Sequence, residues 1–460
     1  MPASIDKLPL EIILLIVNGV ENQQDKLSLA SCSSRMRRFS LPCCYTSLEL
    51  AYPSPPKLCR LLRTFRRNPQ LGQAVRFLRL DGWSAFPPRR PCQLPEPSSP
   101  DIEITAEYAL LLEMVAEYLD YVPSDFLELE KSAKCGVSDV FVAILLTQLP
   151  NVRELSLQAP VNPNNVSGVL EDAVLRCGRF CSEQLFPELT HVTIGPSDRS
   201  LTNRTLFPQI FVWPFYTFPK MCSITTYWIT DSAFYALPYL VPLNNKAYLP
   251  ATSLVTHIDL VDSENAFSVV DMISACPNLV SLKVIRTGDC MDLDVRFLQH
   301  PRAALEEVQS TLQTLWISAS SFNLAHVGGP EGNSWAHFPV LKNLLLNVDY
   351  LLDTPPYSPN SLAAILPASL ETLAMSECST DKLEETIIEV ERLVIDSRER
   401  FPLLREVTIE VHFLPSPSDP DEKPSEDIGP FLRKVRNLGA DTGIRVDLVA
   451  YPNLLWSPEP

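Results

Sequence analysis

The sequence contains no run of about 18 uncharged apolar residues, the length that a membrane-spanning helix requires. Its first apolar stretch, residues 12–17, is short, follows Glu11 and precedes no small-residue cleavage site, so it does not indicate a secretory signal. At the same time 46% of the residues are hydrophobic, which excludes disorder throughout. We therefore expect an intracellular protein, cytoplasmic or nuclear, with no membrane partner.

Motifs for metal binding and catalysis are also missing. The twelve cysteines include no C-x-x-C pair, and the six histidines are scattered, so no metal site is expected. The cysteines are most simply buried small side chains, with an unrecognised thiol role as the alternative. Neither G-x-S-x-G nor a phosphate-binding G-x-x-x-x-G-K-[ST] loop occurs. We predict no catalytic residue and no cofactor; an enzyme would need a deep polar cleft.

Charge is distributed unevenly along the chain. Residues 1–100 carry 14 basic and 7 acidic side chains, whereas the whole chain has a net charge of −17. The acidic remainder should repel phosphate backbones, so nucleic acid is not an expected partner. The 42 prolines, about 9% against a usual ~5%, favour short elements separated by turns.

Residues 4–50 have the pattern of three short helices. The first is expected to start at Ser4 or Asp6 and to end near Gly19, the second to cover 25–31, and the third to cover 33–40 before Pro42 stops it. A piece of this size cannot bury much surface alone. It either caps the domain that follows or docks on another protein.

Three segments within this stretch resemble the F-box motif. They are residues 8–13 (LPLEII), 25–30 (DKLSLA) and 33–39 (SSRMRRF), in that order. The continuation at 41–50 (LPCCYTSLEL) looks like the tail common in fungal F-box proteins. The match covers about one tenth of the chain.

The resemblance implies binding to a Skp-type adaptor within an SCF-type cullin–RING ubiquitin ligase. By position, the first contact helix would supply Leu8, Pro9, Ile12, Ile13 and Ile16. Leu27, Leu29, Cys32, Met36 and Phe39 would supply either the rest of the interface or the core of the module itself. Such recognition places apolar anchors in a groove and charges at the rim.

A second pattern, apolar-x-x-apolar-x-apolar, recurs along the rest of the chain. Its clearest copies are residues 152–157, 279–284, 312–317, 341–346, 370–375 and 404–409, and weaker copies centre on Leu48, Leu78, Val192, Tyr227 and Ile258. Apart from one gap of 77 residues, successive copies are 24 to 37 residues apart, close to a leucine-rich repeat. Each copy predicts a short strand with one buried face.

Helical patterns lie between these strands, at residues 137–149, 266–275, 295–298, 361–366 and 382–401. We therefore predict an irregular leucine-rich-repeat-like α/β solenoid, with parallel short strands and convex helices, preceded by a small all-α F-box module. The expected domains are 1–45 for the module and 46–460 for the solenoid. Proline-rich insertions are expected at 84–100 and 415–430, with a further helix at 103–121 and a last strand at 444–449.

In a leucine-rich array the residues beside the buried strand positions face the concave side. Here the candidates for binding a target protein are Trp228, His257, Asp259, Lys283, Trp316, Asn343 and Asn347, with Thr226 on the same face. An exposed Trp is a typical anchor, although either Trp can instead pack against a neighbouring strand. Lys283 and Asp259 can form a simple cross-strand pair.

Two hypotheses follow from these patterns. In the first, the chain is the substrate receptor of a ubiquitin ligase, in which the helical module holds the adaptor and the solenoid holds a target protein. In the second, it is a protein-binding scaffold outside any ligase, and its first helices only cap the solenoid. The two differ in whether the face of Leu8, Ile12 and Ile16 is exposed to solvent.

Overall fold

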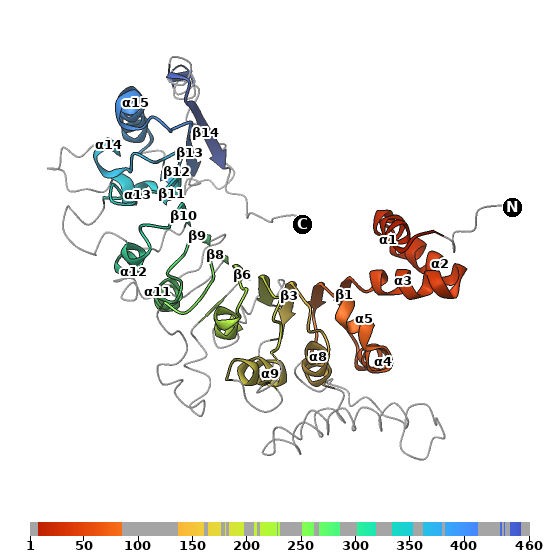
Figure 1. The fold of residues 1–460 in the computed structure, drawn as a ribbon. Coiled ribbons are helices and arrows are strands. Elements are labelled where there is room, and N and C mark those ends of the chain that lie inside the picture. The colour runs from red at the N-terminus through yellow and green to blue at the C-terminus, as the bar shows by residue number, and fades with distance from the viewer. Residues whose placement is uncertain are drawn as a thin grey trace, which may run out of the picture. The chain divides into compact units, whose positions relative to one another are not determined.

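The fold is given by a computed structural model of the chain (Figure 1). The described residues are 8–84, 137–160, 164–175, 180, 184–196, 207–208, 212–227, 229–230, 251–261, 266–285, 301–318, 334–352, 362–379, 382–412, 433–434, 437 and 442–451. They form two compact units, Met1–Met221 and Cys222–Pro460. No helix within these ranges is long and apolar enough to cross a membrane.

The first unit begins with three helices and continues with alternating strands and helices. Its helices are α1 (Leu10–Gly19), α2 (Gln23–Cys32), α3 (Ser34–Cys44), α4 (Pro55–Arg67), α5 (Pro69–Ala74), α8 (Ser138–Thr147), α9 (Asn164–Leu175) and the 3-10 helix η4 (Trp213–Thr217). Its strands are β1 (Ser47–Ala51), β2 (Phe77–Asp81), β3 (Glu154–Ala159), β4 (His191–Pro196) and β5 (Phe207–Pro208).

The second unit repeats the alternation of strand and helix. Its strands are β6 (Ser223–Tyr227), β7 (Ile229–Thr230), β8 (His257–Val261), β9 (Ser281–Ile285), β10 (Thr314–Ser318), β11 (Asn343–Asn347), β12 (Thr372–Ser379), β13 (Glu406–His412) and β14 (Arg445–Tyr451). Its helices are α11 (Ala266–Ala275), α12 (Pro301–Glu307), α13 (Val348–Leu352), α14 (Leu362–Ile365) and α15 (Leu383–Arg400).

Twelve strands belong to a parallel sheet whose order follows the chain: β1 to β4 in the first unit, and β6 followed by β8 to β14 in the second. In each unit the helices that alternate with the strands lie to one side of them (Figure 1). The prediction of an α/β solenoid-like architecture with parallel strands is therefore confirmed. Parallel neighbours need such a crossover between them, which the helices provide.

The apolar positions of the repeat stand in register across the strands. Leu48, Leu78, Leu155 and Val192 are paired in the first unit. In the second unit the paired positions are Ile258, Leu282, Leu315, Leu344, Leu373, Val407 and Val446. All but Leu48 are buried, and they form the core together with the helices. The repeat identified in the sequence is thus the inward row of side chains.

The repeat in β6 is displaced from its expected position. Ile224, not Tyr227, pairs with Ile258, and Tyr227 pairs with Val261 at the end of the strand. The second inward position is Thr226, which is fully buried although it was expected on the concave face. A polar residue at an inward position hid the pattern, so the predicted centre of the repeat lay three residues too late.

The helical predictions need smaller corrections. Helix α11 covers the expected residues, and α8, α14 and α15 lie within theirs. Helix α3 continues through Pro42 to Cys44, where Tyr45 N donates to the Pro42 carbonyl at 3.0 Å. Pro42 has no N–H to donate to the carbonyl four residues earlier, so α3 loses that one hydrogen bond and ends two residues later. Residues 85–100, 103–121, 295–298 and 415–430 lie outside the described residues.

Candidate functional site

The first three helices form a small core of their own. Ile13 and Val17 of α1 and Met36 of α3 are fully buried against one another, with Leu29 and Phe39 packed beside them. Ile13 and Val17 are four residues apart and therefore lie on one face of α1. Helix α3 is held at its start by Ser33, whose hydroxyl accepts from Met36 N at 3.1 Å.

The opposite face of α1 exposes apolar side chains to solvent. Ile12 is 41% exposed, Leu15 68% and Ile16 36%, and Leu27 of α2 is 41% exposed. Positions i, i+3 and i+4 of a helix lie together, so Ile12, Leu15 and Ile16 make one continuous stripe. We call these three residues the α1 face; Leu27, on α2, is exposed as well. Single exposed apolar residues are ordinary, whereas neighbouring ones on one side of a helix make a candidate interaction site.

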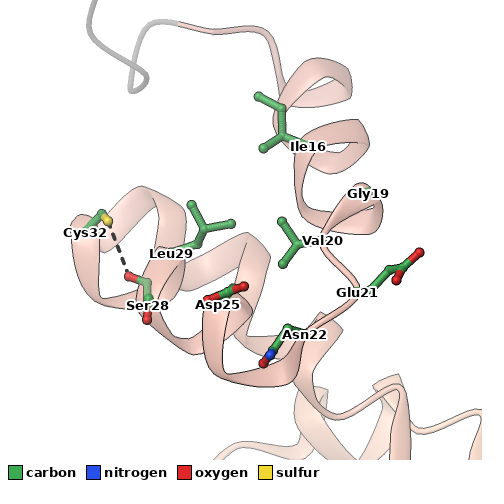
Figure 2. A pocket seen from close by; sticks show the side chains of 9 residues that line it. All are labelled: Ile16, Gly19, Val20, Glu21, Asn22, Asp25, Ser28, Leu29 and Cys32. Atoms are coloured by element: carbon green, nitrogen blue, oxygen red, sulfur yellow. Dashed lines mark hydrogen bonds between the residues drawn. The ribbon is translucent and has the colours of Figure 1, made fainter.

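A groove borders this face between the end of α1 and α2 (Figure 2). Its volume is about 640 Å³, and it is lined by Ile16, Gly19, Val20, Glu21, Asn22, Asp25, Ser28, Leu29 and Cys32. Figure 2 shows Ile16 and Val20 on one side and Leu29 on the other. The groove therefore has apolar side chains from both of its sides, and Glu21 and Asp25 are the two carboxylates among its lining residues.

Local sequence explains the shape of the groove. Asn22 caps α2, because its Oδ1 accepts from Gln24 N at 2.7 Å. The backbone between the two helices is extended at Val20 and Asn22, which ends α1 at Gly19 and separates it from α2. Cys32 Sγ donates to the Ser28 carbonyl at 3.3 Å along the groove wall.

The structure divides the ten predicted adaptor residues into two sets. Pro9, Ile12, Ile16, Leu27 and Cys32 are exposed. Ile13 and Met36 are buried in the module, and Leu8, Leu29 and Phe39 are half-buried beside them. Ile13 was expected to contact a partner, but it is buried and packs with Val17 and Met36 in the core of the module.

Leu15 is an exposed residue that the sequence analysis missed. It is the most exposed member of the α1 face. The signal was available, because Leu15 follows Ile12 by three residues and so shares its side of a helix.

Three of the predicted target-binding residues meet on the sheet of the second unit. Asp259, Lys283 and Trp316 occupy paired positions on β8, β9 and β10. The Lys283 Nζ lies 3.9 Å from Asp259 Oδ1 and 5.0 Å from the centroid of the Trp316 ring. The expected cross-strand pair is therefore present, and Trp316 is 37% exposed.

The polar residues Asn343 and His257, on the same sheet, form hydrogen bonds with hydroxyl groups of neighbouring residues. Asn343 donates to Thr314 Oγ1 at 3.1 Å and accepts from Thr372 Oγ1 at 2.9 Å, so it joins three strands. His257 is exposed on β8, and its Nδ1 lies 2.8 Å from the hydroxyl of Thr256.

Asn347 does not lie on the open surface as expected. It is buried and donates to Glu377 Oε2 at 2.5 Å. Glu377 comes from a bulge in β12, between Met375 and Cys378, which brings its carboxylate to the end of β11. Trp228 lies outside the described residues.

Burial raises the pKa of ionisable groups elsewhere in the protein. Burial raises the pKa of the Cys276 thiol to about 12, and it raises the pKa of the Glu410 carboxyl on β13. In the part of the chain that the structure describes, no three His, Cys, Asp or Glu side chains gather to hold a metal ion. Among the described residues, the candidates for a binding surface are therefore the α1 face and the row of Asp259, Lys283 and Trp316.

A scan against protein-family models finds no match to the chain, and a search of curated proteins finds none that matches it.

Proposed function

We propose that this protein is the substrate-recognition subunit of an SCF-type cullin–RING ubiquitin ligase. In this proposal α1 to α3 bind a Skp-type adaptor, and the strands of the second unit bind a target protein. The observation that carries the proposal is the solvent exposure of Ile12, Leu15 and Ile16 on a helix whose other face already fills the module's core. The resemblance of residues 8–39 to the F-box motif supports the same assignment.

The energetics favour a partner on the α1 face. Burying a Leu or Ile side chain fully is worth about 1.5–3 kcal/mol, so Leu15, at 68% exposed, can still gain roughly 1–2 kcal/mol on contact. Ile12, Ile16 and Leu27 add smaller amounts, because more of each is already covered. A few such anchors around a groove are enough for a specific helix-face interaction.

The alternative is a scaffold whose first helices only cap the repeats. A cap would turn its apolar side toward the rest of the protein. In the first unit the module contacts α5 through α3, and Ile12, Leu15 and Ile16 of α1 remain exposed. This arrangement favours the receptor over the cap.

The receptor would do no bond chemistry itself. Its contribution would be proximity, because holding the target near the activated ubiquitin replaces a random encounter by a local one. For the target side, the row of Asp259, Lys283 and Trp316 is the surface that the described strands support best. Trp316 supplies an exposed anchor, and Lys283 fixes one side of its ring.

The proposal is tested by co-purification with a Skp-type adaptor. The intact chain is compared with Ile12→Asp/Ile16→Asp, which places two charges on the α1 face. The matched control is Ile388→Asp/Ile395→Asp on α15, where both side chains are also exposed (37% and 65%).

We expect the intact chain and the α15 variant to retain the adaptor and the α1 variant to lose it. Circular dichroism shows whether each variant is folded. If the well-folded intact chain does not bind the adaptor, the receptor assignment is wrong and the scaffold remains.

A further inference from the structure

Helix α4 lies within a strongly basic part of the chain. Residues 50–80 contain seven lysine and arginine residues and no aspartate or glutamate, although the whole chain has a net charge of −17. Five of the seven basic residues belong to α4. The surface of this helix is therefore opposite in charge to the chain as a whole.

Basic and apolar side chains lie on different sides of α4. Lys57, Arg60 and Arg67 are exposed, and their spacing of three and seven residues places them together on one side of the helix. We call these three residues the α4 stripe; at 1.5 Å per residue it is about 15 Å long. The apolar side of the helix is buried in the first unit through Leu58, Leu62 and Phe65.

The α4 stripe is unfavourable for the helix by itself. Lys57 lies in the first turn, where the partial positive charge of the helix N-terminus disfavours a cation, and that turn holds no acidic residue. Like charges on the same side of a helix also repel one another. In the structure described, the side chains of Lys57, Arg60 and Arg67 form no ion pair or hydrogen bond. An anion bound along the stripe would remove this repulsion.

We propose that the α4 stripe binds a short acidic segment of a partner protein. An extended chain advances about 3.3 Å per residue, so roughly five residues of such a segment span the stripe. Carboxylates suit this surface, because a guanidinium binds a carboxylate through two parallel hydrogen bonds and two of the three side chains are arginine. The site lies outside the proposed adaptor and target surfaces and does not depend on either.

Two larger anionic partners fit the α4 stripe less well. A helix that binds a membrane surface buries its apolar side in the lipid, whereas the leucine and phenylalanine side chains of α4 are not exposed. A nucleic acid is longer than the stripe, so it would also lie against other parts of a chain whose net charge is −17. A segment of a few acidic residues contacts the stripe alone.

The test uses the full chain and a fluorescein-labelled hexaglutamate peptide. Binding is followed by fluorescence anisotropy at low ionic strength, where charge attraction is least screened. We expect the parent to bind the peptide. Lys57→Gln/Arg60→Gln/Arg67→Gln removes the stripe and should bind it about tenfold more weakly, as the loss of three exposed charge pairs implies.

A matched control separates the stripe from general attraction to positive charge. Arg400→Gln/Arg405→Gln/Arg433→Gln removes the same amount of charge from three exposed positions of the second unit and should bind as the parent does.

A second variant separates charge from the loss of local structure. Lys57→Arg/Arg60→Lys/Arg67→Lys keeps the three charges and should bind within about twofold of the parent. Thermal unfolding gives an independent readout, because removing like charges from one side of α4 should leave the unfolding temperature of the glutamine variant of the stripe unchanged or raise it. A lower unfolding temperature contradicts the repulsion argued for the stripe.

Unlabelled competitors identify the class of partner. At equal concentration of negative charge, hexaglutamate should displace the labelled peptide more effectively than a thymidine oligonucleotide or phosphatidylserine vesicles do. The proposal is overturned if the parent does not bind hexaglutamate, if the two glutamine variants weaken binding equally, or if the oligonucleotide or the vesicles are the better competitor.

Discussion

Replacing Asp139 should destabilise the first unit through the loss of one buried carboxylate. Asp139 lies on α8 and is fully buried. Its Oδ1 accepts from Trp83 Nε1 at 3.0 Å, and its Oδ2 accepts from Asn165 N at 2.7 Å and from Asn165 Nδ2 at 3.0 Å. Asn165 is in the first turn of α9, so the carboxylate of one helix caps the next one.

The contacts set the size of the effect. Asp139→Ala leaves the buried Trp83 N–H and the half-buried Asn165 N–H groups without acceptors, and a fully buried group of this kind costs about 1–3 kcal/mol. We therefore expect a loss of about 3 kcal/mol or more in the free energy of unfolding. Asp139→Asn keeps one acceptor oxygen and the shape of the side chain, so it should cost roughly half as much.

The dependence on pH has a definite sign. Burial raises the pKa of the Asp139 carboxyl above its ordinary value of 3.8, although hydrogen bonds from Trp83 and Asn165 pull it back. The folded chain therefore holds this proton more tightly than the unfolded chain. The stability that the folded chain gains from binding this proton is fully present below the ordinary pKa of the carboxyl, and it is lost as pH rises through the raised pKa of the folded state. The advantage of the parent over Asp139→Asn should grow as pH falls from 7 toward 4.

Urea unfolding at several pH values, followed by circular dichroism, measures both quantities. An advantage over Asp139→Asn that stays constant or shrinks on acidification would contradict the assignment of the raised pKa. A loss below about 1 kcal/mol for Asp139→Ala would refute the capping role itself.

Two further predictions concern the helical module and the thiols. Ile13→Ala should lower the free energy of unfolding of the module by about 2–5 kcal/mol, because Ile13 is fully buried. Leu15→Ala should change it by less than about 0.5 kcal/mol, because Leu15 is exposed. Equal losses for the two variants in urea unfolding would contradict the assignment of a buried and an exposed face to α1. In the native chain Cys276 should resist Ellman's reagent, because it is buried and burial raises its pKa to about 12. The exposed Cys222 and Cys32 should react. Peptide mapping that finds Cys276 modified as fast as Cys222 would disprove this prediction.

The arrangement of the strands follows from the pattern of apolar residues. Inward positions of stacked parallel strands must be apolar, so Leu155, Leu282 and Leu344 mark their strands in the sequence alone. The same reasoning placed α11 and α15, whose apolar residues repeat at the helical period. It failed at β6, where the buried Thr226 interrupts the pattern.

Which side of each element is covered depends instead on tertiary packing. The helical period groups Ile12 with Ile16 and Ile13 with Val17, but either pair could have faced the core. The contact with Met36 selected Ile13 and Val17 and left Ile12 and Ile16 exposed.

Contacts between residues far apart in the chain were likewise beyond the sequence. Asp139 on α8 contacts Asn165 on α9, and Tyr52 packs against Gly82, because parallel strands bring the segments that follow them to the same edge of the sheet. The local sequence pattern determines which secondary structure a segment forms and which of its residues can be buried. The residues that each side chain contacts are determined by the packing of the whole unit.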